Sequence, residues 1–183
     1  MRICVYCASS TAIDASYLEL ARAVGERIAA DGHALVSGGG RVSMMGAVAR
    51  AARAGGAHTT GVIPAHLVPL EVADDDADEL IVVDSMRERK RVMDERSDAF
   101  LALPGGIGTL EELFEVWTAS SLGMHPKPVA VLDPGGFYTP LWSWLESQVA
   151  GGFVREAALA GLHRATTVDD AFAALTAPLN TRY

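Results

Sequence analysis

The chain has 183 residues and carries 15 Lys and Arg against 23 Asp and Glu, which gives a formal net charge of −8 and a sequence pI near 5.0. This length fits a single domain, and a hydrophobic share of 50% supplies a core without disulfides or metals. The acidic balance argues against a nucleic-acid polymer as a partner, because such binding requires many phosphates to be neutralised, whereas a small anion could still bind a local cationic spot.

Apolar runs alternate along the chain with longer segments whose apolar residues repeat at helical spacing. The runs predict buried strands at Arg2–Tyr6, Ala34–Ser37, Thr59–Ile63, Leu80–Val83, Ala99–Leu103 and Val129–Leu132. The helical patterns cover Ser16–Asp31, Ser43–Ala54, Ser85–Arg96, Thr109–Ser121, Pro140–Ala150 and Val168–Leu175. The alternation predicts one doubly wound, Rossmann-like α/β domain over residues 1–183, with a mostly parallel sheet flanked by helices.

No stretch of the sequence approaches the ~20 apolar residues that cross a membrane. Polar residues, Ser9 to Thr11, follow the first apolar run where a signal peptide would continue. We therefore expect a cytoplasmic protein. The histidines lie singly, without the spacing of metal ligands, and we expect neither a metal nor a cofactor.

The two cysteines, Cys4 and Cys7, form a C-x-x-C, which can indicate a redox motif. Both lie in the apolar run from Ile3 to Cys7, which is typical of a strand, and residues three apart on a strand point to opposite faces. We expect them to be small buried residues whose thiols diverge. Further along, Asp74-Asp75-Asp76 is expected to form a solvated loop.

Two glycine-rich segments follow predicted strands, which is where doubly wound sheets bind their ligands. Ser37-Gly38-Gly39-Gly40 follows the second strand, and Pro104-Gly105-Gly106-Ile107-Gly108-Thr109 follows the fifth and opens a helix. Glycines let a backbone approach a ligand closely, and a helix N-terminus attracts anions. The second segment therefore predicts a phosphate site, with a tight turn that binds nothing as the alternative. Its spacing fits neither a P-loop nor G-x-G-x-x-G.

Glu112 follows this segment and allows two interpretations. Thr109-Leu110-Glu111-Glu112 has the pattern of a capping box, with Thr109 at the N-cap and Glu112 bonding back to its amide. The core stripe of the helix comprises Leu110, Leu113, Phe114 and Trp117. Because Glu112 lies off that stripe, it can instead face the crevice.

Two cationic residues, Arg89 and Lys90, lie on the face of the preceding helix that is expected to pack inward. At about 100° per residue, Met86, Arg89, Lys90 and Met93 share one face, and charged residues with Arg87 cover the other. Burying two like charges is costly unless an anion compensates, such as a phosphate or the Glu112 carboxylate. The alternative is that both side chains extend past the methionines to water.

These residues together resemble the Lonely guy (LOG) family of cytokinin-activating phosphoribohydrolases, often mislabelled lysine decarboxylases. The family pattern P-G-G-x-G-T-x-x-E is matched from Pro104 to Glu112, and M-H-x-R-K is matched at Met86, Arg89 and Lys90. Gly38-Gly39-Gly40 with Met45-Gly46 resembles an earlier family element, and the likeness extends to about Phe153. Arg87 replaces the family's frequent His, which we expect to change the rim of the pocket.

The resemblance implies hydrolysis of the N-glycosidic bond of cytokinin riboside 5′-monophosphates and of AMP, with release of free base and ribose 5-phosphate. It implies Arg89 and Glu112 as the catalytic pair and no cofactor or metal. The residues expected to bind substrate are Gly39, Gly40, Glu71, Met86, Lys90, Gly105, Gly106, Ile107, Gly108, Thr109, Leu110, Glu111 and Thr118. The family also implies a homodimer, with a higher homo-oligomer as the alternative.

Two other functions compete with this one. A pyridoxal phosphate decarboxylase would need a Schiff-base lysine, for which Lys90 is the only candidate because Lys127 lies between two prolines. A non-catalytic nucleotide-binding sensor or carrier on the same fold would use the same anion site.

Overall fold

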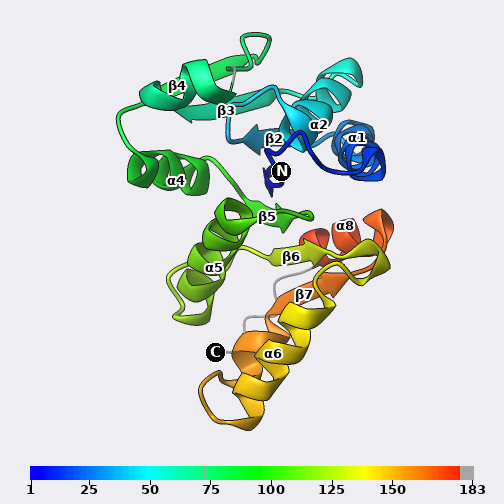
Figure 1. The fold of residues 1–183 in the computed structure, drawn as a ribbon, viewed down its shortest axis with the longest axis vertical. Coiled ribbons are helices and arrows are strands. Elements are labelled where there is room, and N and C mark those ends of the chain that lie inside the picture. Colours follow the sequence, from blue (N-terminus) through cyan, green and yellow to red (C-terminus); the bar gives the residue numbers. More distant parts are fainter. Residues whose placement is uncertain (72, 178–183) are drawn as a thin grey trace.

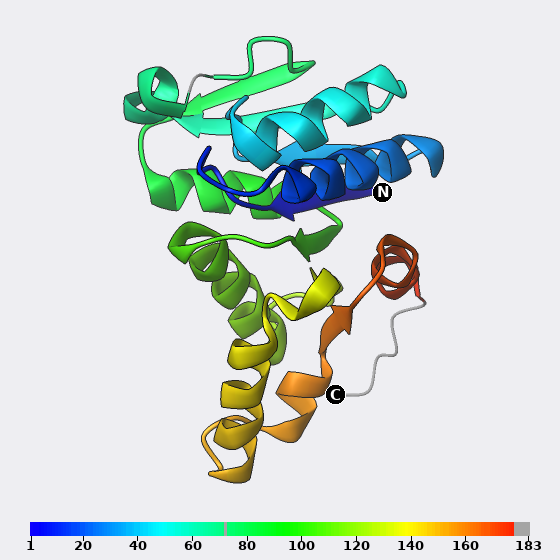
Figure 2. The same cartoon turned by 45° about the vertical axis from the view of Figure 1, so that its right-hand side comes forward.

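The computed structural model describes residues 1–71 and 73–177, and for residues 70 and 71 it describes the backbone alone. A seven-stranded sheet lies between two layers of helices (Figures 1 and 2). Every strand pair in this described part is parallel. In chain order the strands are β1 (Arg2–Tyr6), β2 (Ala34–Ser37), β3 (Thr59–Pro64), β4 (Glu79–Val83), β5 (Ala99–Ala102), β6 (Val129–Leu132) and β7 (Leu162–Ala165). The predicted doubly wound fold is confirmed.

The helices fill the connections between strands. They are α1 (Ala15–Ala30), α2 (Ser43–Ala54), α3 (Val68–Glu71), α4 (Met86–Glu95), α5 (Ile107–Ser121), α6 (Thr139–Ala150), α7 (Glu156–Ala160) and α8 (Val168–Thr176), with 3₁₀ turns η1 (Ala65–Leu67) and η2 (Pro134–Gly136). None of the helices in the described residues has the length and apolar run that crossing a bilayer requires. The sequence pattern missed α3, α7 and β7. Strand β7 was not predicted because its two central residues, His163 and Arg164, are polar and exposed at the edge of the sheet.

The strand order β4-β3-β2-β1-β5-β6-β7 places β1 at the point where the direction of winding reverses. The chain first adds β2, β3 and β4 outward on one side of β1, and then crosses to add β5, β6 and β7 on the other. Ile3 is accordingly paired with Leu35 of β2 on one side and with Ala99 of β5 on the other. A crevice outside the carboxyl ends of β1 and β5 is therefore the expected ligand site of this fold.

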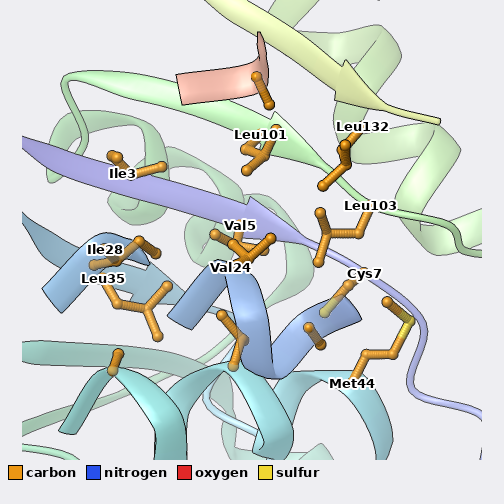
Figure 3. Close-up of a cluster of buried hydrophobic side chains, with 14 of the residues drawn as sticks. Ile3, Val5, Cys7, Val24, Ile28, Leu35, Met44, Leu101, Leu103 and Leu132 are labelled. Carbon is orange, nitrogen blue, oxygen red and sulfur yellow. The ribbon is translucent and has the colours of Figure 1, made fainter. Parts of the chain in front are cut away.

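Alternation along β1 builds a core on each face of the sheet. Ile3, Val5 and Cys7 point into the layer of α1, α2 and α8, as Figure 3 shows for the first two of those helices. Cys4 and Tyr6 point into the layer of α4, α5 and α6. The prediction that the thiols diverge is confirmed, and both cysteines are free and buried. Burial raises the pKa of Cys4 to about 12 and raises that of Cys7 as well, so both thiols stay protonated at neutral pH.

Candidate functional site

The glycine segment after β5 leads into α5 earlier than the sequence pattern indicated. The helix begins at Ile107, and its N-cap is Gly106, which has no side chain to offer. Thr109 is therefore the third residue of the helix and is buried, so the prediction that Thr109 is the N-cap of a capping box with Glu112 is wrong. The physical reason is the close turn at Gly105, where a Cβ would lie 2.1 Å from Thr109 Oγ1. Only glycine lets the chain fold back tightly enough for Thr109 to sit inside the first turn.

The start of α5 is open to solvent. Gly106, Ile107 and Gly108 are exposed, with Ile107 89% exposed. A Cβ built on Gly106 or Gly108 would meet no atom of the described residues within 4 Å. The first N–H groups of a helix have no partner within the helix, and they carry a partial positive charge. An anion can therefore approach this end of α5 directly.

Arg89 is held from α4 against the carboxyl ends of β2 and β3. Its Nε donates to Val62 O at 3.1 Å, its Nη2 donates to Gly38 O at 2.7 Å, and its Nη1 lies 3.8 Å from Met86 Sδ. The residue is 5% exposed, so the prediction that Arg89 faces inward is confirmed. The alternative, that its side chain extends to water, is wrong. A Cβ on Gly38 would lie 2.0 Å from Nη2, so a side chain at that position would displace the guanidinium.

Arg89 and Glu112 line one pocket of about 280 Å³ at the switch point of the sheet. The loop after β1, the turn after β2 and the start of α5 form much of the rest of its wall. Among the predicted substrate-binding residues, those that line this pocket are Met86, Gly106, Ile107, Gly108, Thr109 and Glu111. Met86 lies at the rim and is 39% exposed, so the expectation that it packs inward is wrong.

Lys90 and Thr118 line a neighbouring groove of about 680 Å³ between α4 and α5, which shares Glu111 and Glu112 with the pocket. Lys90 forms ion pairs with Glu111 and, over 2.6 Å, with Glu115 Oε2. Burial lowers the pKa of Lys90, but the hydrogen bonds that its ammonium donates to these two carboxylates outweigh burial and raise the pKa above its ordinary value. The carboxylates of α5 thus compensate the charge of the half-buried Lys90, and Arg87 lies exposed in the same groove, as predicted.

Four further predicted residues line neither the pocket nor the neighbouring groove. Gly39 has a φ of +75° and packs against β3, while Gly40 forms an isolated bridge with Ala73. Gly105 packs on Thr109, and Leu110 packs against the core on the α5 face. These residues shape the turns around the pocket and do not face it. The side chain of Glu71, the last residue of α3, lies outside the described residues.

The sequence pattern missed part of the wall. Ser9 and Ser10 line the pocket from the loop after β1, and Met45 and Leu67 line it from α2 and η1. Ser43 has a φ of +51°, rare for a residue with a side chain, and its Oγ donates to Ser10 O at 2.5 Å. The position of Ser9 and Ser10 directly after the first strand was the available signal, since loops at the carboxyl ends of strands form the sites of this fold.

Comparisons with known proteins place the chain in a family. A family model described as "Possible lysine decarboxylase" matches residues 45–175. The cytokinin riboside 5′-monophosphate phosphoribohydrolase of Mycobacterium tuberculosis is 53% identical over 172 residues, which cover 94% of this chain and 91% of that protein. The rice enzyme of the same name, LOG, is 47% identical over 155 residues, which cover 85% of this chain and 64% of that protein. The chain belongs to the LOG family.

The predicted resemblance is thus confirmed for this LOG protein. Among solved structures, the molybdenum cofactor carrier protein of Chlamydomonas reinhardtii superimposes with a TM-score of 0.72 at 25% identity, covering 94% of both chains. The fold therefore occurs in proteins named as hydrolases and in one named as a carrier.

Proposed function

We propose that this LOG protein hydrolyses the N-glycosidic bond of cytokinin riboside 5′-monophosphates and releases free base and ribose 5-phosphate. The names of relatives as much as 53% identical support this activity. The structural observation that carries it is that Arg89, Glu112 and the open start of α5 line one and the same pocket.

The start of α5 supplies the anchor for the 5′-phosphate. The residues from Gly106 to Thr109 line the pocket, and their backbone N–H groups lie in the first turn of the helix, where anions bind favourably. Binding energy gained at the phosphate then orients the distant glycosidic bond.

The chemistry at the sugar requires a carboxylate and a fixed cation. Loss of the base builds oxocarbenium-like positive charge on the ribose. We assign to Glu112 the stabilisation of that charge and the positioning of the attacking water, whose oxygen ends on the ribose while the base takes a proton. We assign to Arg89 the holding of the nucleotide as the base departs, because a guanidinium stays protonated and donates hydrogen bonds.

AMP is the second substrate that we propose. The phosphate anchor and the two charged residues act on the part of the nucleotide that AMP shares with its N-substituted relatives. The remaining side chains of the pocket include Met45, Leu67 and Met93, which are apolar and suited to a base. Nothing in this arrangement requires a substituent on the adenine.

The test replaces Glu112 with Gln, which keeps size and hydrogen-bonding capacity but removes the charge. We expect Glu112→Gln to lower the rate of base release by about 10²-fold or more, measured as free base by chromatography. Glu146→Gln, an exposed residue of α6, is the matched control and should behave like the wild type. Release by Glu112→Gln at the wild-type rate would remove Glu112 from catalysis.

A non-catalytic carrier is the second candidate, favoured by the likeness to the molybdenum cofactor carrier. A carrier would bind nucleotide in the same pocket and return it intact. Incubation with AMP and with an isopentenyl derivative separates the two: binding seen by calorimetry without any free base supports the carrier, and free base supports the hydrolase.

A lysine decarboxylase is disfavoured by the surroundings of the lysines. Lys90 is paired with Glu111 and Glu115, which raise its pKa, whereas a lysine that forms a Schiff base needs its pKa lowered. Lys127 Nζ donates to the carboxylate and to the backbone carbonyl of Asp94, at 2.6 and 2.7 Å. Neither ammonium is therefore prepared to act as a nucleophile.

We also propose that the protein is a cytoplasmic homodimer. Leu122 and Met124, at the end of α5, are 65% and 74% exposed and could be covered by a second copy. Trp117, by contrast, is buried, and its Nε1 donates to Ala158 O at 2.8 Å, so it belongs to the core. Light scattering should give twice the mass of the chain, and the mass of a single chain would contradict the dimer.

A further inference from the structure

A buried ion pair ties α2 to the segment that leads from α3 to β4. Arg53 Nη1 and Nη2 donate to Asp74 Oδ2 and Oδ1 at 2.7 and 2.9 Å, and Nη1 also donates to Thr59 Oγ1 at 3.3 Å. The side chains of Arg53 and Asp74 are only 17% and 5% exposed. The expectation of a solvated Asp74 is therefore wrong because Arg53 compensates its charge, while Asp75 and Asp76 are exposed as expected. Two parallel hydrogen bonds fix orientation as well as distance.

The backbone beside this pair holds the glycine turn after β2. Asp74 N donates to Gly39 O at 2.9 Å, and Ala73 forms an isolated antiparallel bridge with Gly40. Gly39 adopts the left-handed φ of +75° that makes the turn. The position of Asp74, set by Arg53, is thus transmitted directly to this turn.

The same turn holds Arg89. Gly38 O accepts from Arg89 Nη2 at 2.7 Å, and Gly38 lines the pocket beside that guanidinium. Ala73 N donates to Val68 O at 3.3 Å, which connects the pair to the segment that carries Leu67 into the pocket wall. A shift of Asp74 would therefore move both the acceptor of Arg89 and the part of the pocket wall that Leu67 forms.

We propose that Arg53 and Asp74 are positioning residues for the catalytic arginine: their two-point contact sets the glycine turn, and the turn sets the Arg89 guanidinium. Neither side chain is part of the pocket wall that the described residues form, so both act through Arg89. This inference rests on the proposed function, since it concerns the rate at which the base is released.

The decisive variant is Arg53→Lys. Lysine keeps a positive charge beside Asp74 but replaces two fixed N–H donors by one point charge. We expect a melting temperature close to that of the wild type together with a fall in kcat for AMP of about fivefold, and little change in KM, because small misplacements of a catalytic group cost rate. Arg53→Met should lower kcat by more than about tenfold for the same reason, measured at a temperature where circular dichroism shows that the variant is folded.

Arg164→Met is the matched control. Arg164 Nη2 and Nε donate to the fully buried carboxylate of Asp133 at 2.6 and 2.9 Å, on the β6–β7 side of the sheet. This variant also leaves a buried carboxylate without its guanidinium, so it should lose stability but keep kcat per folded molecule. If the Arg53 variants likewise keep the wild-type kcat once folded, the Arg53–Asp74 pair is only structural and the proposal is overturned.

A spectroscopic measurement separates this proposal from the proposed function. The ¹H–¹⁵N resonance of Arg89 Nε, assigned with Arg89→Lys, reports its hydrogen bond to Val62 O without any turnover. Arg53→Lys should shift this resonance, and Arg164→Met should not. A wild type that releases no base would overturn the proposed function alone, whereas an unmoved Arg89 resonance in Arg53→Lys would overturn the positioning role whatever the activity.

Discussion

At the scale of single residues, the guanidinium of Arg89 is held by two backbone carbonyls, those of Gly38 and Val62. Helical spacing was enough to predict that Arg89 faces inward, because the angle between successive residues of a helix is fixed. It could not identify the two carbonyls, since they lie 51 and 27 residues away along the chain and meet Arg89 only in the folded sheet. Asp74 was misjudged for the same reason, because its partner Arg53 lies on another element.

A substitution at Gly38 tests the hydrogen bond from Arg89 Nη2 to Gly38 O. A Cβ at position 38 would lie 2.0 Å from Arg89 Nη2, so Gly38→Ala must push the guanidinium away from its acceptor. We expect base release to fall by about tenfold or more. In Gly161→Ala, a Cβ would meet its nearest carbonyl at an ordinary 3.4 Å, so this variant should keep full activity. Equal activities in the two variants would show that Arg89 needs no fixed position.

Protonation of His125 should make the free energy of unfolding depend on pH. Its Nδ1 accepts from Lys127 N at 3.2 Å, and its Nε2 lies 3.0 Å from Val116 O, an arrangement that suits the neutral ring. Burial, helped by the Lys127 charge and opposed by Asp94, lowers the pKa of His125. The unfolded chain, with a histidine pKa of about 6.5, therefore binds more protons below that pH than the folded chain does, and the free energy of unfolding falls as the pH drops.

The measurement is urea unfolding at pH 7.5 and at pH 5.5. The wild type should be less stable at the lower pH, and His125→Gln should show a smaller decline. His33, whose pKa is also lowered by burial, contributes in the same direction and stays in both proteins. An identical decline in wild type and variant would mean that His125 is not involved.

At the scale of elements, the start of α5 shows what a sequence pattern leaves open. The pattern T-x-x-E favoured a start at Thr109, yet the helix begins at Ile107 because Gly105 lets the chain turn tightly against the Thr109 side chain. Whether a glycine turn is tight or wide depends on what it packs against, which the local sequence does not specify. The prediction of an anion site at this end did not depend on the starting residue.

Gly108→Ala separates the stability of α5 from the function of its first turn. Alanine is the better helix former, and the structure offers room for a methyl group, so the free energy of unfolding should rise by about 0.5–1 kcal/mol. Because Gly108 lines the pocket where we place the phosphate, AMP should bind more weakly, as measured by calorimetry. A gain in stability with unchanged AMP affinity would place the phosphate elsewhere.

At the scale of the whole molecule, the sheet separates two cores, one on each of its faces. The core beneath α1, α2 and α8 contains Phe172, and the core beneath α4, α5 and α6 contains Phe100, which stacks on Tyr6 at 6.1 Å. Tyr6 in turn lines the pocket. The alternation of apolar runs and helical patterns predicted the architecture because it depends on periodicity alone, whereas the edge strand β7 lacked such a run.

Matched substitutions in the two cores should therefore differ in function and agree in stability. Phe100→Leu and Phe172→Leu each remove ring contacts from a fully buried site and should cost about 1–3 kcal/mol of unfolding free energy. Phe100→Leu should also lower kcat, because Tyr6 loses its stacking partner at the pocket wall, and Phe172→Leu should not. Equal kcat values per folded molecule would show that the pocket is insensitive to the core beneath it.

A crystal structure of Glu112→Gln with AMP bound would show directly whether the start of α5 holds the phosphate and whether Arg89 and residue 112 face the sugar. We expect phosphate oxygens within hydrogen-bonding distance of the backbone N–H groups of residues 106–109, and a ribose whose glycosidic carbon faces Arg89 and residue 112. AMP bound away from the start of α5, or with its ribose directed away from those two side chains, would contradict this expectation.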